Sequence, residues 1–182
     1  MQRVSFPKRS SDPILLPEFI IGKEAPRPQG RGLRSTCRSK KMNLVISPFT
    51  LDAYENVMTL WKESEGVGLS RADSKESIRF YLERNPNMSL LAKDTKGALV
   101  GAVLCGHDGR RGYIHHLAVR SDCRRQGIGR KLVEEVLSRL QAAGIQKCHL
   151  FIINDNVSGI EFWKSLGWTP RTDIGVISKD IL

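Results

Sequence analysis

The sequence is poor in cysteine and has no long hydrophobic run, and both absences narrow what the protein can be. Its 182 residues include four cysteines, which form no Cys-x-x-Cys pair and have no histidine at zinc-finger spacing. We therefore expect reduced thiols and no metal site. The longest apolar runs, 99–105 and 150–153, are far shorter than the roughly 20 residues that span a bilayer. Because Pro17 and Glu18 also divide the apolar residues near the N-terminus, no signal-peptide core is present, and we expect a cytoplasmic protein without a membrane anchor.

The positive charge is concentrated near the N-terminus. The whole chain has a formal net charge of +10. Residues 1–41 contain ten Lys or Arg and three Asp or Glu, hence +7, which leaves +3 for residues 42–182. Five of the eight prolines also lie in residues 1–41, which lack helical or strand periodicity and are expected to form a disordered extension. The nearly ordinary charge of residues 42–182 argues against a nucleic-acid partner for the folded part.

From residue 42 onward the pattern is that of one folded α/β domain. Apolar spacings of three and four predict helices over 51–63, 74–84, 128–143 and 156–165. Strand-like runs cover 44–48, 88–92, 98–105, 113–119 and 148–153, and residues 168–182 are expected to add one or two closing strands. Because a helix joins strands 113–119 and 148–153, these two should be parallel, with a right-handed crossover. The predicted order is β-α-α-β-β-β-α-β-α-β(-β), a mixed sheet.

A basic, glycine-containing turn joins strand 113–119 to helix 128–143. It reads Arg124-Arg125-Gln126-Gly127-Ile128-Gly129-Arg130. Free backbone N–H groups and the positive end of the helix dipole would face this turn, and its two glycines would let an oxygen-rich ligand approach the backbone. The turn therefore predicts a phosphate site, with a plain charged loop as the alternative.

The motif Arg124-x-x-Gly127-x-Gly129 resembles the (Gln/Arg)-x-x-Gly-x-(Gly/Ala) motif of the GNAT superfamily of acetyl-CoA-dependent N-acetyltransferases, in its bacterial-type single-domain form. The resemblance extends over residues 42–168 and includes the Phe-Trp-Lys-Ser-Leu-Gly-Trp sequence at 162–168. It implies a fold in which a splayed pair of parallel strands holds coenzyme A. Residues 42–182 would then be the N-acetyltransferase domain.

The resemblance also implies roles for individual residues. The strand before the turn would pair with the pantetheine arm of coenzyme A, the amides of the turn would hold its pyrophosphate, and an asparagine after the next strand would contact the cofactor. The implied cofactor contacts are Leu117, Ala118, Val119, Arg124, Arg125, Gln126, Gly127, Ile128, Gly129, Arg130, Asn156 and Trp163.

Trp163 departs from the family pattern. Many relatives have a tyrosine at this position as a candidate acid for the leaving thiolate, and an indole N–H cannot donate a proton at neutral pH. Two roles for Trp163 stay open, packing on the pantetheine and filling the core. The thiolate would then receive its proton from water, from another residue or from no specific acid. The departure also keeps open an alternative, a CoA-binding regulatory domain of the same fold without turnover.

The candidate base comes from two adjacent histidines. An amine must lose a proton before it attacks a thioester, which favours a group that titrates near neutral pH. Side chains alternate along a strand, so His115 is expected to share a face with Tyr113, Leu117 and Val119, and His116 to lie on the other face. Family relatives often place a base on the first face, which makes His115 the predicted base. A structural role for His115 is the alternative, with Glu65 and Tyr113 as further candidates.

The predicted function is transfer of an acetyl group from acetyl-CoA to a primary amine of a small molecule or of a peptide or protein. The amine would attack directly in a ternary complex, without a covalent enzyme intermediate. Residues 65–70 and 171–176 are expected to line the amine pocket, but neither stretch has a charge pattern that selects one class of acceptor. Assembly as a homodimer is left open.

Overall fold

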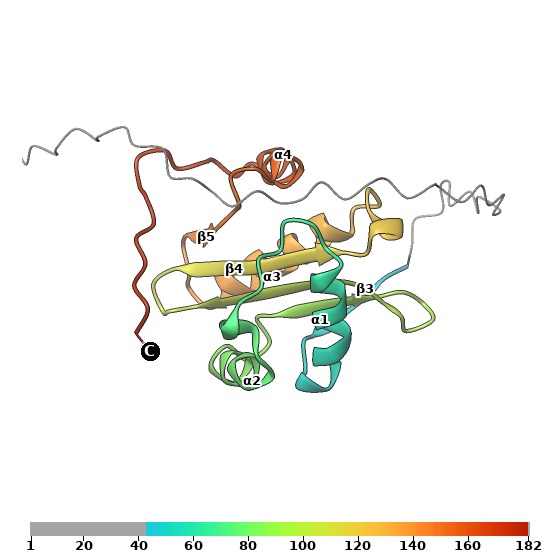
Figure 1. Ribbon diagram of the computed structural model, residues 1–182. Helices are drawn as coiled ribbons and strands as arrows, with labels where there is room; N and C mark the ends of the chain where they lie inside the picture. Colours follow the sequence, from blue (N-terminus) through green and yellow to red (C-terminus); the bar gives the residue numbers. More distant parts are fainter. Residues whose placement is uncertain (1–42, 182) are drawn as a thin grey trace, which may run out of the picture. The chain divides into compact units, whose positions relative to one another are not determined.

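The computed structural model describes residues 43–181, so the predicted extension over residues 1–41 lies outside the described residues. Its centre is one sheet of five strands in the order β1-β2-β3-β4-β5, shown in Figure 1. The first four strands are antiparallel neighbours, and β4 and β5 are parallel. Their bounds are β1 Val45–Pro48, β2 Leu90–Lys93, β3 Leu99–His107, β4 Gly112–Val119 and β5 Cys148–Leu150. The mixed sheet with its parallel pair confirms the predicted fold class.

Within residues 43–181, four α-helices accompany the sheet, in the predicted order. They are α1 Tyr54–Lys62, α2 Lys75–Arg84, α3 Ile128–Ala142 and α4 Val157–Ser165. Short 3-10 turns occur at Leu51–Ala53, Arg71–Asp73 and Ser121–Cys123. Ser74 is the N-cap of α2, and its hydroxyl accepts a hydrogen bond from the Ser77 N–H and so satisfies one free donor of the first turn. None of the helices between residues 43 and 181 is long and apolar enough to cross a membrane.

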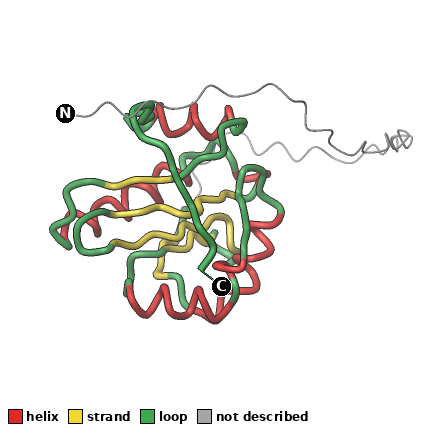
Figure 2. Tube along the Cα trace, turned by 60° about the vertical axis from the view of Figure 1, so that its left-hand side comes forward, coloured by secondary structure: helices red, strands yellow, loops and turns green. Residues whose placement is uncertain are grey.

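Two apolar clusters cover the two faces of the sheet. They lie between the strands and the helices, whose layers Figure 2 shows. The α3-side cluster contains Leu90, Ala92, Val100, Val103, Cys105, Ile114, Cys123, Ile128, Leu132, Val136, Leu140 and Ile145. The α1-side cluster contains Phe49, Tyr54, Val57, Leu60, Trp61, Ile78, Leu91, Ala102, Leu104 and Ala118. Strand β3 contributes to both clusters, which explains why its sequence is a continuous apolar run rather than an alternating one.

The parallel pair parts at a β-bulge. Ile114 pairs with Leu150, and no later residue of β4 has a partner on the β5 side within the described chain. On the other edge of β4, Ile114 pairs with Cys105 and His116 pairs with Leu104, so His115 is an extra residue without a partner. A bulge bends its strand and increases the local twist. The bend coincides with the end of the β4–β5 ladder, and the predicted splayed strand pair is therefore present.

The prediction of one or two closing strands is wrong. Residues 169–181 contain neither helix nor strand. Ile174, Val176, Ile177 and Ile181 in this segment are exposed. The prediction relied on apolar content, but β5 has only three residues and offers few backbone groups for a further strand to pair with. Trp168 is the residue that ties the start of this segment to the α3-side cluster.

A chain shortened to begin at Met42 should keep the fold, because residues 44–168 of the described chain build two apolar clusters, one on each face of the sheet. We propose residues 42–182 as an independently folding domain. The expected result is one cooperative thermal transition at the same midpoint as the full chain, followed by circular dichroism. A lowered midpoint or insoluble protein would show that residues 1–41 contribute to the folded structure.

Candidate active site

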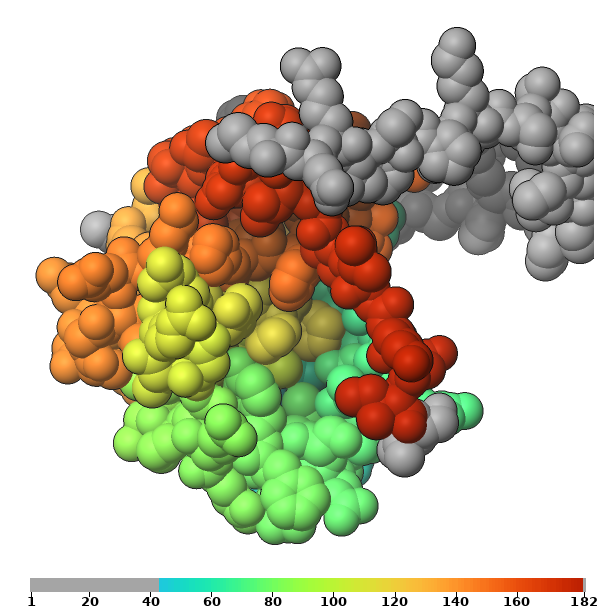
Figure 3. Space-filling view, turned by 90° about the vertical axis from the view of Figure 1, so that its left-hand side faces the viewer, coloured from blue at the N-terminus to red at the C-terminus, as the bar shows by residue number. Residues whose placement is uncertain are grey.

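A cavity of about 1250 Å³ opens where β4 and β5 part. Figure 3 shows the hollow between the α2 region, the β3–β4 hairpin and the residues that follow β5. Its walls are residues 114–119 of β4, residues 150–153, the loop between α1 and α2, the first turn of α3, and α4. One edge of β4 is paired with β3, while beyond Ile114 the other edge has no strand partner in the described chain and faces this opening. The cavity can therefore hold a ligand that uses backbone hydrogen bonds of β4.

The N-terminus of α3 forms one end of the cavity. Gly127 is the N-cap, with φ at +79°, and no side chain caps the helix. A Cβ added at Gly127 would have no atom within 4 Å, so the space beside this residue is open. Residues 127–130, whose backbone N–H groups begin the helix, line the cavity. Arg125 is also left-handed, with φ at 61°. Free amides, a positive helix dipole and nearby arginines together make an anion site.

Most of the predicted cofactor residues line this cavity. They are Leu117, Ala118, Val119, Arg124, Arg125, Gly127, Ile128, Gly129, Arg130, Asn156 and Trp163. Gln126 is the predicted member of the set that does not line it. Arg124 is turned back, and its Nε donates to the carbonyl of Val119 at 3.2 Å, so this arginine holds the turn against the end of β4.

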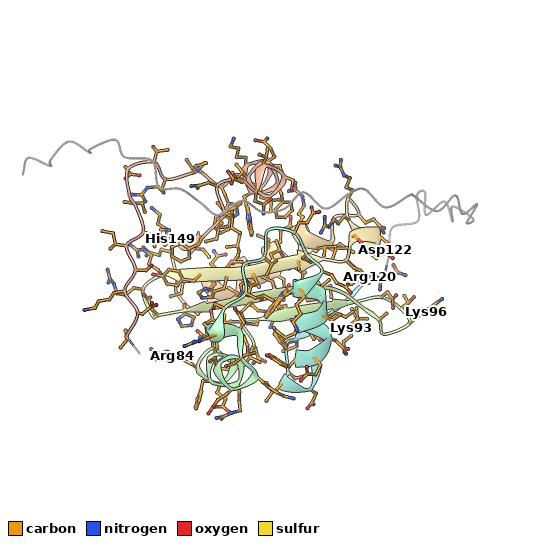
Figure 4. All side chains as sticks on the ribbon, in the orientation of Figure 1. Arg84, Lys93, Lys96, Arg120, Asp122 and His149 are labelled. Carbon is orange, nitrogen blue, oxygen red and sulfur yellow. The ribbon has the colours of Figure 1, made fainter. Side chains whose placement is uncertain are left out.

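The turn between β4 and α3 is shaped by its own contacts. Arg120 Nε donates to Asp122 Oδ1 at 2.7 Å, and Arg120 Nη2 donates to Cys123 Sγ at 3.2 Å. The hydrogen bond from Arg120 lowers the pKa of Asp122, so this carboxylate stays charged beside the arginine. Figure 4 shows Arg120 and Asp122 at one end of the sheet and His149 at the opposite end.

The second glycine of the motif serves helix packing. A Cβ at Gly129 would lie 3.2 Å from Phe162 Cζ on α4 and 3.7 Å from Val119 Cγ2. Gly129 therefore lets the first turn of α3 approach α4 closely, whereas Gly127 provides the left-handed backbone. From the sequence, both glycines were expected to let a ligand approach the backbone.

Trp163 combines the two roles that the sequence left open. Its ring packs edge to face with Trp168 at 5.0 Å and with Phe162 at 5.2 Å, and it contacts the α3-side cluster. The same residue also lines the cavity. Trp163 is thus a partly buried wall of the site.

The prediction that His115 and His116 lie on opposite faces is wrong. Leu117 packs on the α3-side cluster, but both histidines turn toward α1 and α2, and both line the cavity. His115 packs edge to face on Tyr81 at 5.3 Å. His116 packs on Trp61 at 4.7 Å. The bulge explains the error, because an extra residue interrupts the alternation on which the prediction relied.

The environment of His115 favours a neutral imidazole. Its ring is open to the cavity but is flanked by Tyr81 and by Tyr113, with which it stacks at 6.3 Å. These rings exclude part of the bulk water from His115, and this desolvation lowers its pKa. The neighbouring His116 lowers the pKa further, whereas Asp73 raises it. A neutral histidine with access to the cavity can accept a proton.

Asp73 is a site residue that sequence reasoning missed. Its Oδ1 lies 2.7 Å from His116 Nε2, in a pair whose side chains are 7% and 12% exposed. Its Oδ2 accepts from the Ser70 N–H at 2.7 Å, and its carbonyl accepts from the Tyr54 hydroxyl at 2.8 Å. Asp73 thereby ties the loop between α1 and α2 to β4. The Ser70-x-x-Asp73 spacing, typical of a capping box, is the local signal for its contact with Ser70, but nothing local in the sequence points to His116.

One of the two segments that were expected to line an amine pocket lies on the cavity wall. Within 65–70, five residues line the cavity, namely Glu65, Gly66, Val67, Gly68 and Ser70, whereas residues 171–176 do not line it. Tyr113, one further base candidate, lies outside the lining, and Glu65 lies within it. Tyr81 also lines the cavity; burial raises its pKa, so its phenol stays protonated.

The cysteines of the described residues lie outside the cavity lining. Cys105 and Cys123 are buried, and burial raises the pKa of both thiols, that of Cys105 to about 12. Protonated thiols are poor nucleophiles. Between residues 43 and 181 there is also no cluster of three His, Cys, Asp or Glu side chains that could hold a metal ion.

Comparisons with known proteins point to one family. The family model described as acetyltransferase (GNAT) family matches residues 54–168. An acetyltransferase of Sodalis glossinidius is 30% identical over 139 residues, which cover 75% of this chain and 95% of that protein. An acetyltransferase of Pectobacterium atrosepticum is 34% identical over 123 residues, which cover 66% of this chain and 84% of that protein.

Two solved structures have the same fold. The PaiA N-acetyltransferase of Thermoplasma acidophilum, in complex with coenzyme A, superimposes with a TM-score of 0.64 at 18% identity, over 74% of this chain and 94% of that one. The ribosomal-protein-S18-alanine N-acetyltransferase of Escherichia coli gives a TM-score of 0.61 at 19% identity, over 71% of this chain and 80% of that one. At these identities the two structures support the fold alone.

Proposed function

Since this chain belongs to the acetyltransferase (GNAT) family, we propose that it transfers the acetyl group of acetyl-CoA to a primary amine of a small molecule, peptide or protein. The observation that carries this proposal is the single cavity in which the uncapped start of α3, the free edge of β4 and the loop between α1 and α2 meet. The same cavity is thus lined by an anion site, a free strand edge and a pair of histidines.

The residues present fit coenzyme A. The N–H groups at 127–130 suit a pyrophosphate, because these residues line the cavity at the positive end of α3. The free edge of β4 over 117–119 suits the amide groups of a pantetheine arm. Arg125, Arg130 and Trp163 complete that wall. When bound there, the thioester supplies an activated carbonyl carbon for an amine to attack.

We assign proton removal from the amine to His115. Its lowered pKa keeps the imidazole neutral, and its ring is open to the cavity. The neutral amine then forms a bond to the carbonyl carbon, the bond to sulfur breaks as the thiolate leaves, and the amide nitrogen gives up its remaining extra proton to the thiolate or to water. Direct attack is supported by the position of the described cysteines outside the cavity lining and by the raised pKa of the buried thiols. Cytoplasmic location is retained as a prediction from the sequence.

A thiol-release assay with acetyl-CoA tests this function across small amines, peptides with free N-termini and aminoglycosides. The expected result is release of thiol that requires one class of amine, together with one equivalent of acetylated amine identified by mass spectrometry. Binding of acetyl-CoA without amine-dependent release in any class would favour the regulatory alternative, for which the replacement of tyrosine by Trp163 is the one argument.

A further inference from the structure

Two loops from opposite sides of the cavity meet at Gly66. In Figure 1 the loop between α1 and α2 rises past β4 toward α4. At its top, a Cβ added to Gly66 would overlap the Nδ2 atom of Asn156 and would lie 2.8 Å from Asn156 Cγ. Nearby, a Cβ at Gly68 would lie 3.9 Å from Ile153 Cδ1. The acceptor-side loop is therefore packed directly against the side chain that begins α4.

The orientation of the Asn156 amide is fixed by its capping role. Its Oδ1 accepts from the Gly159 N–H at 2.9 Å and from the Ser158 hydroxyl at 3.3 Å. The other end of the amide, Nδ2, lies between Gly66 and Gly159, since a Cβ added at Gly159 would lie 2.7 Å from it. Nδ2 has no hydrogen-bond acceptor among the described residues. It is also not among their fully buried polar atoms without a partner, so it keeps some access to solvent. Asn156 thus presents a donor on the cavity wall.

We propose that Gly66 is a positioning residue for the cofactor: its bare Cα seats the Asn156 amide so that Nδ2 can donate to coenzyme A. The proposal rests on the proposed function, in which coenzyme A occupies this cavity. Because Glu65, Val67 and Ser70 of the same loop line the cavity, the segment that faces the acceptor would also set the affinity for the cofactor.

Glycine meets two separate requirements at this position. The φ of +80° is one that other residues rarely adopt. The collision with Asn156 is independent of φ, since any Cβ must push the amide away, either off its helix cap or out of the cavity. Gly97 meets the first requirement alone, because its φ is +82° and an added Cβ would have no atom within 4 Å. Gly97 therefore offers a matched control for backbone strain.

The test is calorimetric titration of coenzyme A into the full chain and into Gly66→Ala, Gly97→Ala, Asn156→Ser and the double variant Gly66→Ala/Asn156→Ser. Serine keeps a capping oxygen and lacks Nδ2. Loss of one hydrogen bond should raise Kd about five- to tenfold in Gly66→Ala and in Asn156→Ser. Gly97→Ala should keep the wild-type Kd. The double variant should bind like Asn156→Ser alone, because no amide remains to be displaced, and should fold even if Gly66→Ala does not.

The outcomes separate this role from the proposed function. A wild-type chain that binds coenzyme A together with a Gly66→Ala variant of unchanged Kd would overturn the role of Gly66 alone. Additive losses in the double variant would overturn it too, since Gly66 would then act by another route. A wild-type chain that does not bind coenzyme A would overturn the proposed function and, with it, this role.

Discussion

Gly127→Glu should abolish the binding of coenzyme A. Gly127 is the N-cap of α3, and the space in front of its Cα is open. A glutamate there would fill the proposed pyrophosphate site and would place a negative charge against the phosphates. The positive end of the helix dipole would also attract the new carboxylate in place of the ligand. Titration calorimetry should detect no heat of binding at concentrations that saturate the wild-type chain.

The matched control is Gly109→Glu in the β3–β4 hairpin. Gly109 has φ at +90° and, like Gly127, has no atom within 4 Å of an added Cβ. Both variants should therefore lose similar stability, about 1 to 3 kcal/mol, through backbone strain. Wild-type affinity in Gly109→Glu with none in Gly127→Glu is the expected pair of results. A folded Gly127→Glu variant that still binds coenzyme A would move the pyrophosphate site elsewhere.

His115→Ala should lower kcat/KM by roughly 10²- to 10⁴-fold, the range typical of a positioned acid–base group, with little change in the affinity for coenzyme A. Because desolvation beside the neighbouring aromatic rings lowers the pKa of His115, the wild-type enzyme should stay active at a lower pH than an ordinary histidine base would allow. In the variant the acid limb of the pH–rate profile should follow the pKa of the amine substrate. The loss should therefore shrink at high pH.

The control for this variant is His149→Ala rather than His116→Ala. His116 lines the cavity and is bonded to Asp73, so its removal would disturb the site. His149 lies on the neighbouring strand, packs on Tyr113 at 6.0 Å and does not line the cavity. His149→Ala should keep the wild-type profile. A silent His115→Ala variant, with an unchanged acid limb, would exclude His115 as the base.

The sequence predicted the parts of the fold that local patterns determine. Apolar spacing identified α1 to α4, and the length of the segment between β4 and β5 required a parallel pair. The turn at 124–130 was recognisable because glycines and arginines are consecutive there. The two glycines have different roles, because Gly127 has a left-handed φ and Gly129 packs against Phe162. The sequence alone does not show this difference.

What escaped prediction depends on contacts between distant residues or on backbone irregularity. The bulge at His115 changes which way two histidines point, and no pattern in 113–119 reports it. Asp73 and His116 are 43 positions apart. Gly66, in the loop between α1 and α2, packs against the side chain of Asn156, which is far from it in sequence. The apolar residues of 174–177 resembled a strand, but pairing requires a sheet edge long enough to accept one.

Acetyl-CoA binding to the full chain tests the central claim most directly. A ligand that binds only the native state stabilises it by about 2.7 kcal/mol at a hundredfold excess over Kd. We therefore predict a rise in melting temperature that grows with acetyl-CoA concentration and fits a single site. An unchanged melting temperature at millimolar acetyl-CoA would contradict the assignment of this cavity to coenzyme A and the acetyltransferase function built on it.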